Sequence, residues 1–215
     1  MKHYNVVIAT PGFSMDSGYV KSLMATCERL MDEEITFTFL SEYSSFVPHA
    51  REATAMGSRN LRYDKSEIGG GRFTYDVIFW IDSDIVWEPE DFLKLYRRWD
   101  LDVVAGLYLL DDERSIPAQP LGSLRRMEKS EVKFRKDTIQ VGAVGFGFVC
   151  MRSGVFEKTP RPWFKLARLN RGDERPELMV GEDFSWCYSA IENGFKIWVD
   201  TSVTVTHRKI RDLKI

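Results

Sequence analysis

Short apolar runs alternate with helical patterns along the first half of the chain, and this alternation limits the possible folds most strongly. Turn or polar residues end each run, as in a strand that is buried on both faces. An alternation of this kind predicts an α/β fold, with a mostly parallel, doubly wound sheet flanked by helices. The predicted strands are Val6–Ala9, Ile35–Leu40, Val77–Ile81 and Val103–Leu110, and the predicted helices are Ser17–Asp32, residues 48–60 and a helix opening at Pro89.

The second half has a different pattern. Residues 111–140 are polar and predict a surface excursion or a hairpin, and residues 142–151 resemble a glycine-rich loop that runs into a strand. Residues 64–75 and 158–180 resemble mobile loops that could close over ligands. A helix at residues 182–193 and two short strands at 196–199 and 202–206 complete the chain. Since no repeat or linker divides the sequence, we expect residues 1–215 to form one domain.

Composition excludes several classes of protein. The chain has 30 Lys and Arg against 32 Asp and Glu, a net charge of −2, so no overall charge attracts nucleic acid or anionic membranes. Six basic residues gather between Arg125 and Lys136; they are a modest hint of a nucleic-acid acceptor, and a solvated surface is the favoured reading. Cys27, Cys150 and Cys187 fit buried thiols in a reducing compartment.

The chain shows no signal peptide at its start, and its longest apolar run is far below the ~18 residues that a membrane span needs. We therefore expect a soluble, cytoplasmic protein without a membrane span, and peripheral attachment to a membrane stays open.

The sequence contains two Asp-x-Asp triplets, and their positions separate them. Ligands of open α/β sheets bind beyond the carboxyl ends of the strands. Asp82-Ser83-Asp84 follows a predicted strand and lies at that edge, whereas Asp100-Leu101-Asp102 precedes one and lies at the opposite edge. Two carboxylates at a strand end suit Mg²⁺ or Mn²⁺ that bridges a diphosphate. Asp82 and Asp84 are therefore candidate metal ligands, and Asp100 and Asp102 are interpreted as a solvated turn.

His207 ends a predicted strand and is a candidate third ligand, although a lone histidine near the end of a chain is more often a surface or packing residue. Together with the two aspartates it would form an O,O,N set, which favours Mn²⁺ over Mg²⁺.

Glu182 and Asp183 open a helix. Acidic residues are common there because they meet unpaired N–H groups, and we expect a carboxylate in that position to stay ionised. The functional alternative is a general base, or a group that orients an acceptor hydroxyl.

Gly145 and Gly147, like Gly142, would let the backbone approach a ligand, or simply form tight turns. Three tryptophans of the second half fit a hydrophobic core, and Trp163, between Pro162 and Phe164, is retained as a possible sugar-stacking residue.

The ordered motifs resemble those of a GT-A fold glycosyltransferase, close to the family-2-like enzymes common in phages and large viruses. The motifs are VVIATPG, VPHAREATA, DVIFWIDSDIVWEPEDF, DVVAGLY, VGAVGFGFVCMRSGVFE and GEDFSWCYSAIENGFKIWVDTSVTVTH. The resemblance implies a nucleotide-sugar-binding half at 1–110 and an acceptor-binding, catalytic half at 111–215. It implies a metal-dependent hexosyltransferase that uses a nucleotide-diphosphate sugar, UDP-glucose by our best guess, and a hydroxyl acceptor such as a glycan.

The resemblance also implies roles for single residues. Asp84 would bind the metal, Asp82 would face the ribose or metal, and His207 would be the third ligand. The remaining roles are donor binding by Thr10, Pro11, Gly12, Arg51 and Ser83, base catalysis by Asp183 with Glu182 as its competitor, and an acceptor border at Gly145, Phe146 and Gly147.

Two features depart from the family pattern. Glu52 follows Arg51 where the family often has asparagine, which leaves the contact of Arg51 open. The carboxylate pair suits inversion, whereas a terminal histidine ligand suits retention, and inversion is slightly favoured.

Two other functions fit parts of the sequence. Asp82-Ser83-Asp84-Ile85-Val86 resembles the motif of haloacid-dehalogenase-type phosphohydrolases, in which the first aspartate is the nucleophile. Against that reading, the motif strand normally opens the domain, and His207 would have no role. The other alternative is a module of the same fold that binds nucleotide sugar or glycan without catalysis.

Overall fold

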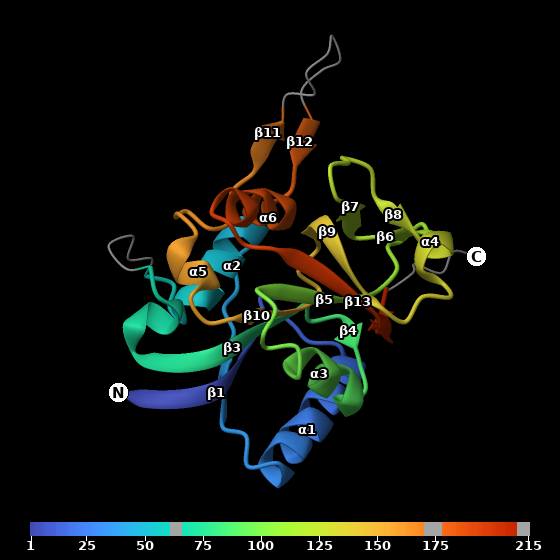
Figure 1. Cartoon of the computed structure of the whole chain (residues 1–215). Coiled ribbons are helices and arrows are strands. Elements are labelled where there is room, and N and C mark those ends of the chain that lie inside the picture. The colour runs from blue at the N-terminus through green and yellow to red at the C-terminus, as the bar shows by residue number, and fades with distance from the viewer. Residues whose placement is uncertain (61–65, 170–177, 210–215) are drawn as a thin grey trace, which may run out of the picture.

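The computed structural model describes residues 1–60, 66–169 and 178–209, which form a three-layer α/β structure (Figure 1). Its elements, in chain order, are β1 (Lys2–Ala9), α1 (Ser17–Asp32), β2 (Phe37–Leu40), α2 (Val47–Met56), the 3₁₀ turn η1 (Ile68–Gly71), β3 (Phe73–Ile81), β4 (Ile85–Val86), α3 (Pro89–Tyr96), β5 (Val103–Leu107), β6 (Ser115–Ile116), β7 (Ala118–Pro120), β8 (Met127–Glu128), α4 (Lys129–Val132), β9 (Thr138–Val144), β10 (Phe148–Arg152), α5 (Val155–Lys158), β11 (Ala167–Leu169), β12 (Leu178–Val180), α6 (Glu182–Glu192), β13 (Ile197–Thr204) and β14 (Thr206–His207).

The apolar runs are strands buried on both faces of one sheet, as the sequence predicts. Alternate side chains of a strand point to opposite faces. Val77 and Phe79 of β3 therefore pack into a core under α1 and α3, whereas Ile78 and Trp80 pack into a second core under α2, α5 and α6 (Figure 1). Continuous apolar sequence is thus required, because neither face of the central strands meets water.

Helix boundaries follow local signals. The Asp16 carboxylate accepts a hydrogen bond from Gly18 N at 2.6 Å and caps α1, which begins and ends at the predicted residues. Pro89 opens α3, and Gly57 ends α2 in the left-handed conformation with φ of 59°. No helix among the described residues has both the length and the apolar character that crossing a bilayer would need.

The eight-stranded sheet has the order β2-β1-β3-β10-β5-β13-β9-β7 and is mixed, although six of its strands run in one direction. This confirms an α/β fold with a mostly parallel sheet. Within this sheet β10, from the second half of the chain, runs antiparallel between β3 and β5. An antiparallel strand begins where its parallel neighbours end, so the loop before β10 lies at their carboxyl edge.

The polar segment 111–140 was expected as an excursion or hairpin, and it contributes more than that. Its β6 and β8 form a small antiparallel pair, while β7 joins the edge of the main sheet through β9. The two predicted closing strands are one strand, β13, which continues into the short β14.

The described parts of the two predicted mobile loops contain secondary structure. Ile68–Gly71 form η1 and residues 73–75 belong to β3, whereas residues 61–65 lie outside the described residues. Residues 158–169 and 178–180 form the end of α5, a packed segment and the β11–β12 pair, and residues 170–177 lie outside.

A buried ion pair holds the packed segment. Arg161 Nη2 lies 2.8 Å from Glu52 Oε2, with side chains 5% and 3% exposed, and Phe164 N donates to Glu52 Oε1 at 3.0 Å. Glu52, the departure from the family pattern, therefore anchors residues 161–164 against α2.

We expect Glu52→Gln to lower the free energy of unfolding by about 3 kcal/mol, because the amide keeps an acceptor for Phe164 N but removes the Glu52 charge that lies against the buried Arg161 guanidinium. Urea unfolding measures this. The control is Glu90→Gln, which breaks an exposed ion pair to Arg97 of 2.7 Å and is expected to cost under about 1 kcal/mol. Equal effects of the two variants would contradict an anchoring role for Glu52.

Candidate active site

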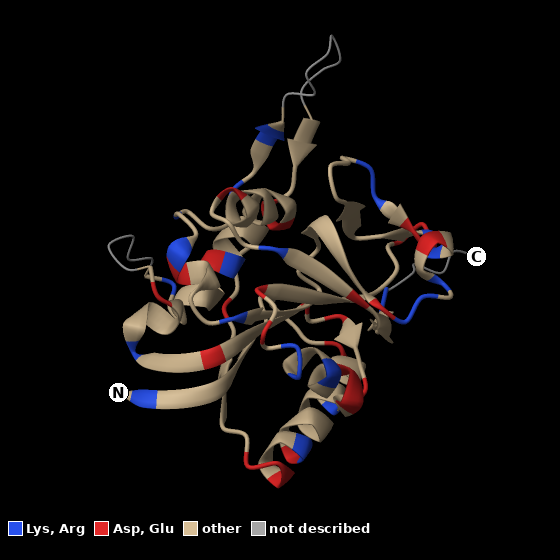
Figure 2. Cartoon of the chain, viewed as in Figure 1, with Lys and Arg blue, Asp and Glu red and all other residues tan. Residues whose placement is uncertain are grey.

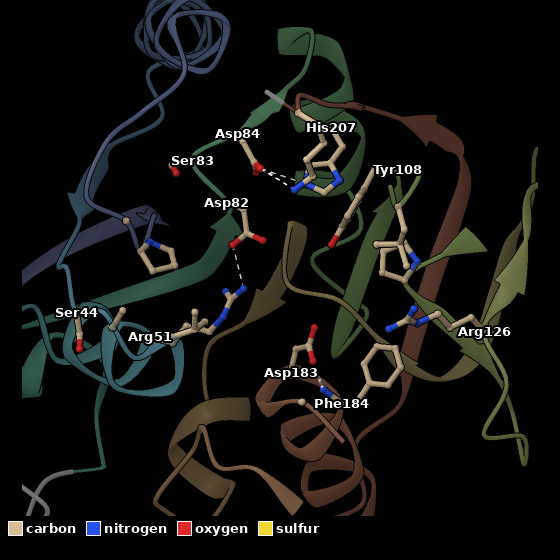
Figure 3. A pocket seen from close by; sticks show the side chains of 18 residues that line it. Ser44, Arg51, Asp82, Ser83, Asp84, Tyr108, Arg126, Asp183, Phe184 and His207 are labelled. Atoms are coloured by element: carbon tan, nitrogen blue, oxygen red, sulfur yellow. Dashed lines mark hydrogen bonds and ion pairs between the residues drawn. The ribbon is translucent and has the colours of Figure 1, made fainter. Parts of the chain in front are cut away.

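A cavity of about 500 Å³ opens where the carboxyl ends of β1, β3 and β5 meet (Figure 3). This is the edge at which open α/β sheets bind ligands. The start of α6 and the last described residues close the cavity from the other side. Its lining includes Pro11 and Gly12 after β1, Arg51 on α2, Asp82, Ser83 and Asp84 after β3, Tyr108 after β5, Arg126 before β8, Gly181, Asp183 and Phe184 at α6, and His207 and Lys209.

A short strand pair brings His207 to Asp84. β14 pairs antiparallel with β4, with His207 opposite Ile85, and Arg208 N donates to Asp84 O at 2.8 Å. As a result His207 Nε2 lies 3.2 Å from Asp84 Oδ2 (Figure 3). The other ring nitrogen, Nδ1, lies 3.0 Å from Leu109 O. A carbonyl can only accept, so Nδ1 carries a proton, and a hydrogen bond from Nε2 to the Asp84 carboxylate requires that Nε2 is protonated as well.

Lys209 provides a second cation to Asp84, with Nζ at 3.1 Å from Oδ2. Burial opposes ionisation of the Asp84 carboxyl, but the hydrogen bonds from His207 and Lys209 outweigh it and lower its pKa. The hydrogen bond to Asp84 in turn raises the pKa of His207.

Asp84 and His207 are the predicted metal ligands that the structure brings together. Among residues 1–60, 66–169 and 178–209, no group of three or more His, Cys, Asp or Glu is placed to hold a metal ion. One carboxylate and one imidazole nitrogen nevertheless converge within 3.2 Å at the cavity wall, and this pair of donor types is one that divalent cations accept. Asp82, the other predicted ligand, is directed to Arg51 instead.

Arg51 is buried beneath the cavity, where it joins two carboxylates. Its Nη2 donates to Asp82 Oδ1 at 2.9 Å (Figure 3). Its Nε donates to Glu182 Oε1 at 3.1 Å. The guanidinium carbon lies 5.9 Å from the Trp80 ring centre and 5.5 Å from that of Phe146. Burial would lower the pKa of Arg51, but the neighbouring carboxylates outweigh burial and raise it. Glu182 is thereby committed to Arg51 and does not line the cavity.

Asp183 faces the cavity from the first turn of α6 (Figure 3). Phe184 N donates to Asp183 Oδ1 at 2.7 Å. Burial and the Glu182 charge outweigh Arg51 and raise the pKa of Asp183 to about 6. The sequence-based expectation of a carboxylate simply kept ionised by the helix end is therefore incomplete. Asp183 is ionised at neutral pH, but its pKa is high enough for it to take up a proton.

Tyr108 is a site residue that the sequence reasoning missed. Its hydroxyl accepts a hydrogen bond from Gly147 N at 3.1 Å, and its ring meets the His207 ring edge to face at 5.3 Å. Burial, followed by the charges of Asp82 and Asp183, raises the pKa of the phenol well above its ordinary value. One signal could have identified it, because Tyr108 is the first residue after β5, as Asp82 is after β3.

The segment Gly145-Phe146-Gly147 lies beneath Tyr108. A Cβ on Gly147 would come within 2.5 Å of the Tyr108 ring and hydroxyl, and one on Gly145 within 2.8 Å of that hydroxyl. Phe146 is 1% exposed and packs under Arg51. Asp82 N donates to Gly147 O at 3.0 Å, so the segment supports the aspartate triplet. These glycines therefore make room for a side chain of the protein.

Two predicted binding residues lie in the core. Thr10 is 0% exposed and hydrogen-bonds the Tyr19 hydroxyl, so Pro11 and Gly12, but not Thr10, line the cavity. The prediction that Trp163 stacks on a sugar is wrong, because its side chain is buried and its indole N–H donates to Phe156 O and Thr159 O. Arg126, Phe184 and Lys209 line the cavity and were not predicted.

Comparison with known proteins gives a fold but no family. No protein-family model and no curated protein matches the sequence. The structure is similar to A197 from STIV, with a TM-score of 0.60 and 20% identity over 96% of this chain and 86% of that one. It is also similar to GalNAc-T7 crystallised with UDP, GalNAc and Mn²⁺, with a TM-score of 0.56 and 13% identity.

The similarity to GalNAc-T7 extends over 95% of this chain and 44% of the GalNAc-T7 chain. A third similar structure is the catalytic domain of Drosophila beta1,4galactosyltransferase 7 in complex with xylobiose, with a TM-score of 0.53 and 10% identity over 98% of this chain and 72% of that one. The chain therefore has the GT-A fold of glycosyltransferases, as the sequence resemblance implies.

We expect Gly147→Ala to destabilise the protein by about 2 kcal/mol, because its Cβ would overlap the Tyr108 ring. Thermal unfolding of the variant measures the effect. Gly142→Ala is the matched control in the same segment, since its Cβ would meet no atom closer than 3.3 Å. A Gly147→Ala protein as stable as wild type would show that Tyr108 is free to move away.

Proposed function

We propose that this protein is a glycosyltransferase that moves a sugar from a nucleotide-diphosphate sugar to a hydroxyl acceptor. The observation that carries the proposal is one cavity, at the ligand-binding edge of a GT-A fold, that holds the Asp84–His207 pair and the raised-pKa carboxyl of Asp183 on opposite sides. The Asp84–His207 pair suits a charged leaving group, and the Asp183 carboxyl suits an acceptor that must lose a proton.

The donor would lie against Pro11 and Gly12, which follow β1, and Ser83, which follows β3, because these three residues line the cavity. We propose a uridine diphosphate sugar, with glucose as the sugar on the sequence resemblance; GalNAc-T7, a protein of similar fold, was crystallised with UDP. Arg126 and Lys209 line the same cavity and add positive charge that a diphosphate would meet. Arg51 would act from below, by holding Asp82, and not by contacting the base.

Asp84 and His207 would hold a divalent cation. The nitrogen donor favours Mn²⁺ over Mg²⁺, and GalNAc-T7 was crystallised with Mn²⁺. A cation bound there would neutralise the charge that develops on the diphosphate. Asp82 is then a positioning residue, because its carboxylate is bound to Arg51 and keeps the loop of the triplet in place.

Asp183 would be the general base. Its carboxylate accepts the proton of the acceptor hydroxyl, whose oxygen forms a bond to the anomeric carbon. The bond from that carbon to the diphosphate oxygen breaks, and its electron pair leaves with the nucleoside diphosphate. Attack from the face opposite the leaving group inverts the anomeric centre, so we favour an inverting enzyme. The acceptor, a glycan in our proposal, would enter beside Phe184 and Gly181, next to Asp183.

For donor binding, we expect UDP-glucose with Mn²⁺ at about 100 times its Kd to raise the melting temperature by about 5–10 °C. Asp84→Ala should abolish that rise, and EDTA should do the same to the wild type. Asp100→Ala, in the second Asp-x-Asp triplet at the opposite sheet edge, should leave it intact. If no nucleotide sugar or nucleotide diphosphate shifts the melting temperature, the donor-site assignment is wrong, and phosphatase activity through Asp82 becomes the next test.

For turnover, we expect Asp183→Asn to keep the donor-induced shift and to lose transfer by about 10²–10⁴-fold, since the amide cannot take a proton. In the wild type kcat/KM should fall as the pH drops below about 6, because protonated Asp183 cannot act as a base. The rate of sugar transfer is measured from the amount of nucleoside diphosphate that the reaction releases. A fully active Asp183→Asn protein would contradict the assignment of the base, and donor binding without turnover on any acceptor would favour a binding module.

A further inference from the structure

A basic lobe beside the site contributes only Arg126 to the proposed transfer, and its other basic residues have no role there. It comprises residues 125–137, which form β8, α4 and the chain that follows, and Figure 2 shows its lysines and arginines gathered there. Six basic and two acidic residues lie between Arg125 and Lys136, in a protein whose net charge is −2. The lobe is therefore a local exception to the charge balance of the chain.

Only part of this charge is neutralised within the protein. Arg125 forms a two-point contact with Glu131 at 2.7 and 2.8 Å, and Arg135 forms one with Asp137. Lys129, Lys133 and Lys136 are exposed, and within the described part of the chain none of them meets a carboxylate at ion-pair distance. Three free ammonium groups thus remain on one short segment.

These lysines surround a crevice with an apolar floor. The crevice has a volume of about 320 Å³ and lies between α4 and the ends of β5 and β13. Leu107, Ile116 and Val132 are buried beneath it, and Val205 completes its floor. Tyr108 lines both this crevice and the site cavity, so the two are neighbours. An apolar floor with a cationic rim matches a ligand that combines a hydrocarbon chain with an anionic head.

Phe134 adds an exposed aromatic ring to the same lobe. It is 87% exposed, with Lys133 Nζ at 5.3 Å from its ring centre. Trp99 offers a comparison, being 65% exposed and preceded by Arg97 and Arg98. Those arginines are paired with Glu90 and Asp200, so the surface at Trp99 lacks the free charge of the lobe.

We propose that the basic lobe binds the surface of a membrane that contains anionic phospholipid. Phe134 inserts at the boundary of headgroups and acyl chains, Lys129, Lys133 and Lys136 meet the lipid phosphates, and the crevice accepts an apolar segment of lipid. The aliphatic side chains of Leu107, Ile116, Val132 and Val205 in the crevice favour lipid over nucleic acid, because a hydrocarbon chain packs against them. Single-stranded nucleic acid is instead bound by aromatic side chains on which successive bases stack, and Phe134 is the one exposed aromatic ring within residues 125–137 of the described chain. This docking is independent of the proposed transferase activity, and it would place the site cavity beside the membrane.

Co-sedimentation of the full chain with vesicles tests the proposal. We expect binding to an equal mixture of phosphatidylcholine and phosphatidylglycerol, weak or no binding to phosphatidylcholine alone, and weakening by salt. Replacing Lys129, Lys133 and Lys136 together by glutamine should weaken binding by about 100-fold, at about fivefold for each charge. Phe134→Ala should weaken it by about tenfold. Because all four side chains are exposed, the melting temperature of each variant should match that of the wild type.

Trp99→Ala is the matched control and should bind vesicles like the wild type. Three results would overturn the proposal: no binding to anionic vesicles, equal binding to neutral ones, or binding that the triple lysine variant retains. A single-stranded oligonucleotide that binds through the same lysines, while vesicles do not bind, would make the lobe a nucleic-acid surface instead. The donor-induced thermal shift is measured separately, so a failure of membrane binding and a failure of the transferase proposal are distinguishable.

Discussion

The buried guanidinium of Arg51 holds three separate parts of the chain in one site. It lies on α2 and donates to Asp82 at the end of β3 and to Glu182 at the start of α6. A buried charge of this kind is costly unless it is paired, and here two carboxylates and two aromatic rings provide its surroundings. The dependence is mutual, because Asp82, Glu182 and Asp183 would repel one another strongly without a central cation. The acidic character of the site therefore depends on a residue that barely reaches its surface.

Much of the fold and part of the site could be predicted because their causes are local. Strands buried on both faces must be apolar throughout, so Val77–Ile81 is recognisable as a central strand, and whatever follows such a strand lies at the ligand edge. This reasoning located Asp84 and separated it from Asp100, which precedes a strand. It also applies to Tyr108, but an aromatic residue in an apolar stretch is read as core unless the end of the strand is known.

The parts that could not be predicted depend on residues far apart in sequence. Nothing in the sequence near β10 reveals that it runs antiparallel between β3 and β5. The segment around Trp163 has the composition of a loop, and it is packed because Arg161 pairs with Glu52, 109 positions earlier. The glycines at 145 and 147 are recognisable as sites of close approach, but the sequence does not reveal that the Tyr108 side chain lies against both. In each case the sequence indicates what kind of residue or element is present, but it does not indicate what that residue or element packs against.

Two carboxyl groups in one cavity, those of Asp84 and Asp183, have their pKa values shifted in opposite directions. Burial acts against the charge of both. At Asp84 the hydrogen bonds from His207 and Lys209 outweigh it, so the carboxylate is held as an anion suited to a cation. At Asp183 the adjacent Glu182 adds to burial, and Arg51 offsets only part of the effect, so the carboxyl exchanges a proton near pH 6. In the proposed function, separation of this kind would give an electrostatic role to Asp84 and a proton-transfer role to Asp183. Because Glu182 and Arg51 modify the pKa that burial raises at Asp183, the ion pair that organises the fold of the site also adjusts the pKa of that carboxyl.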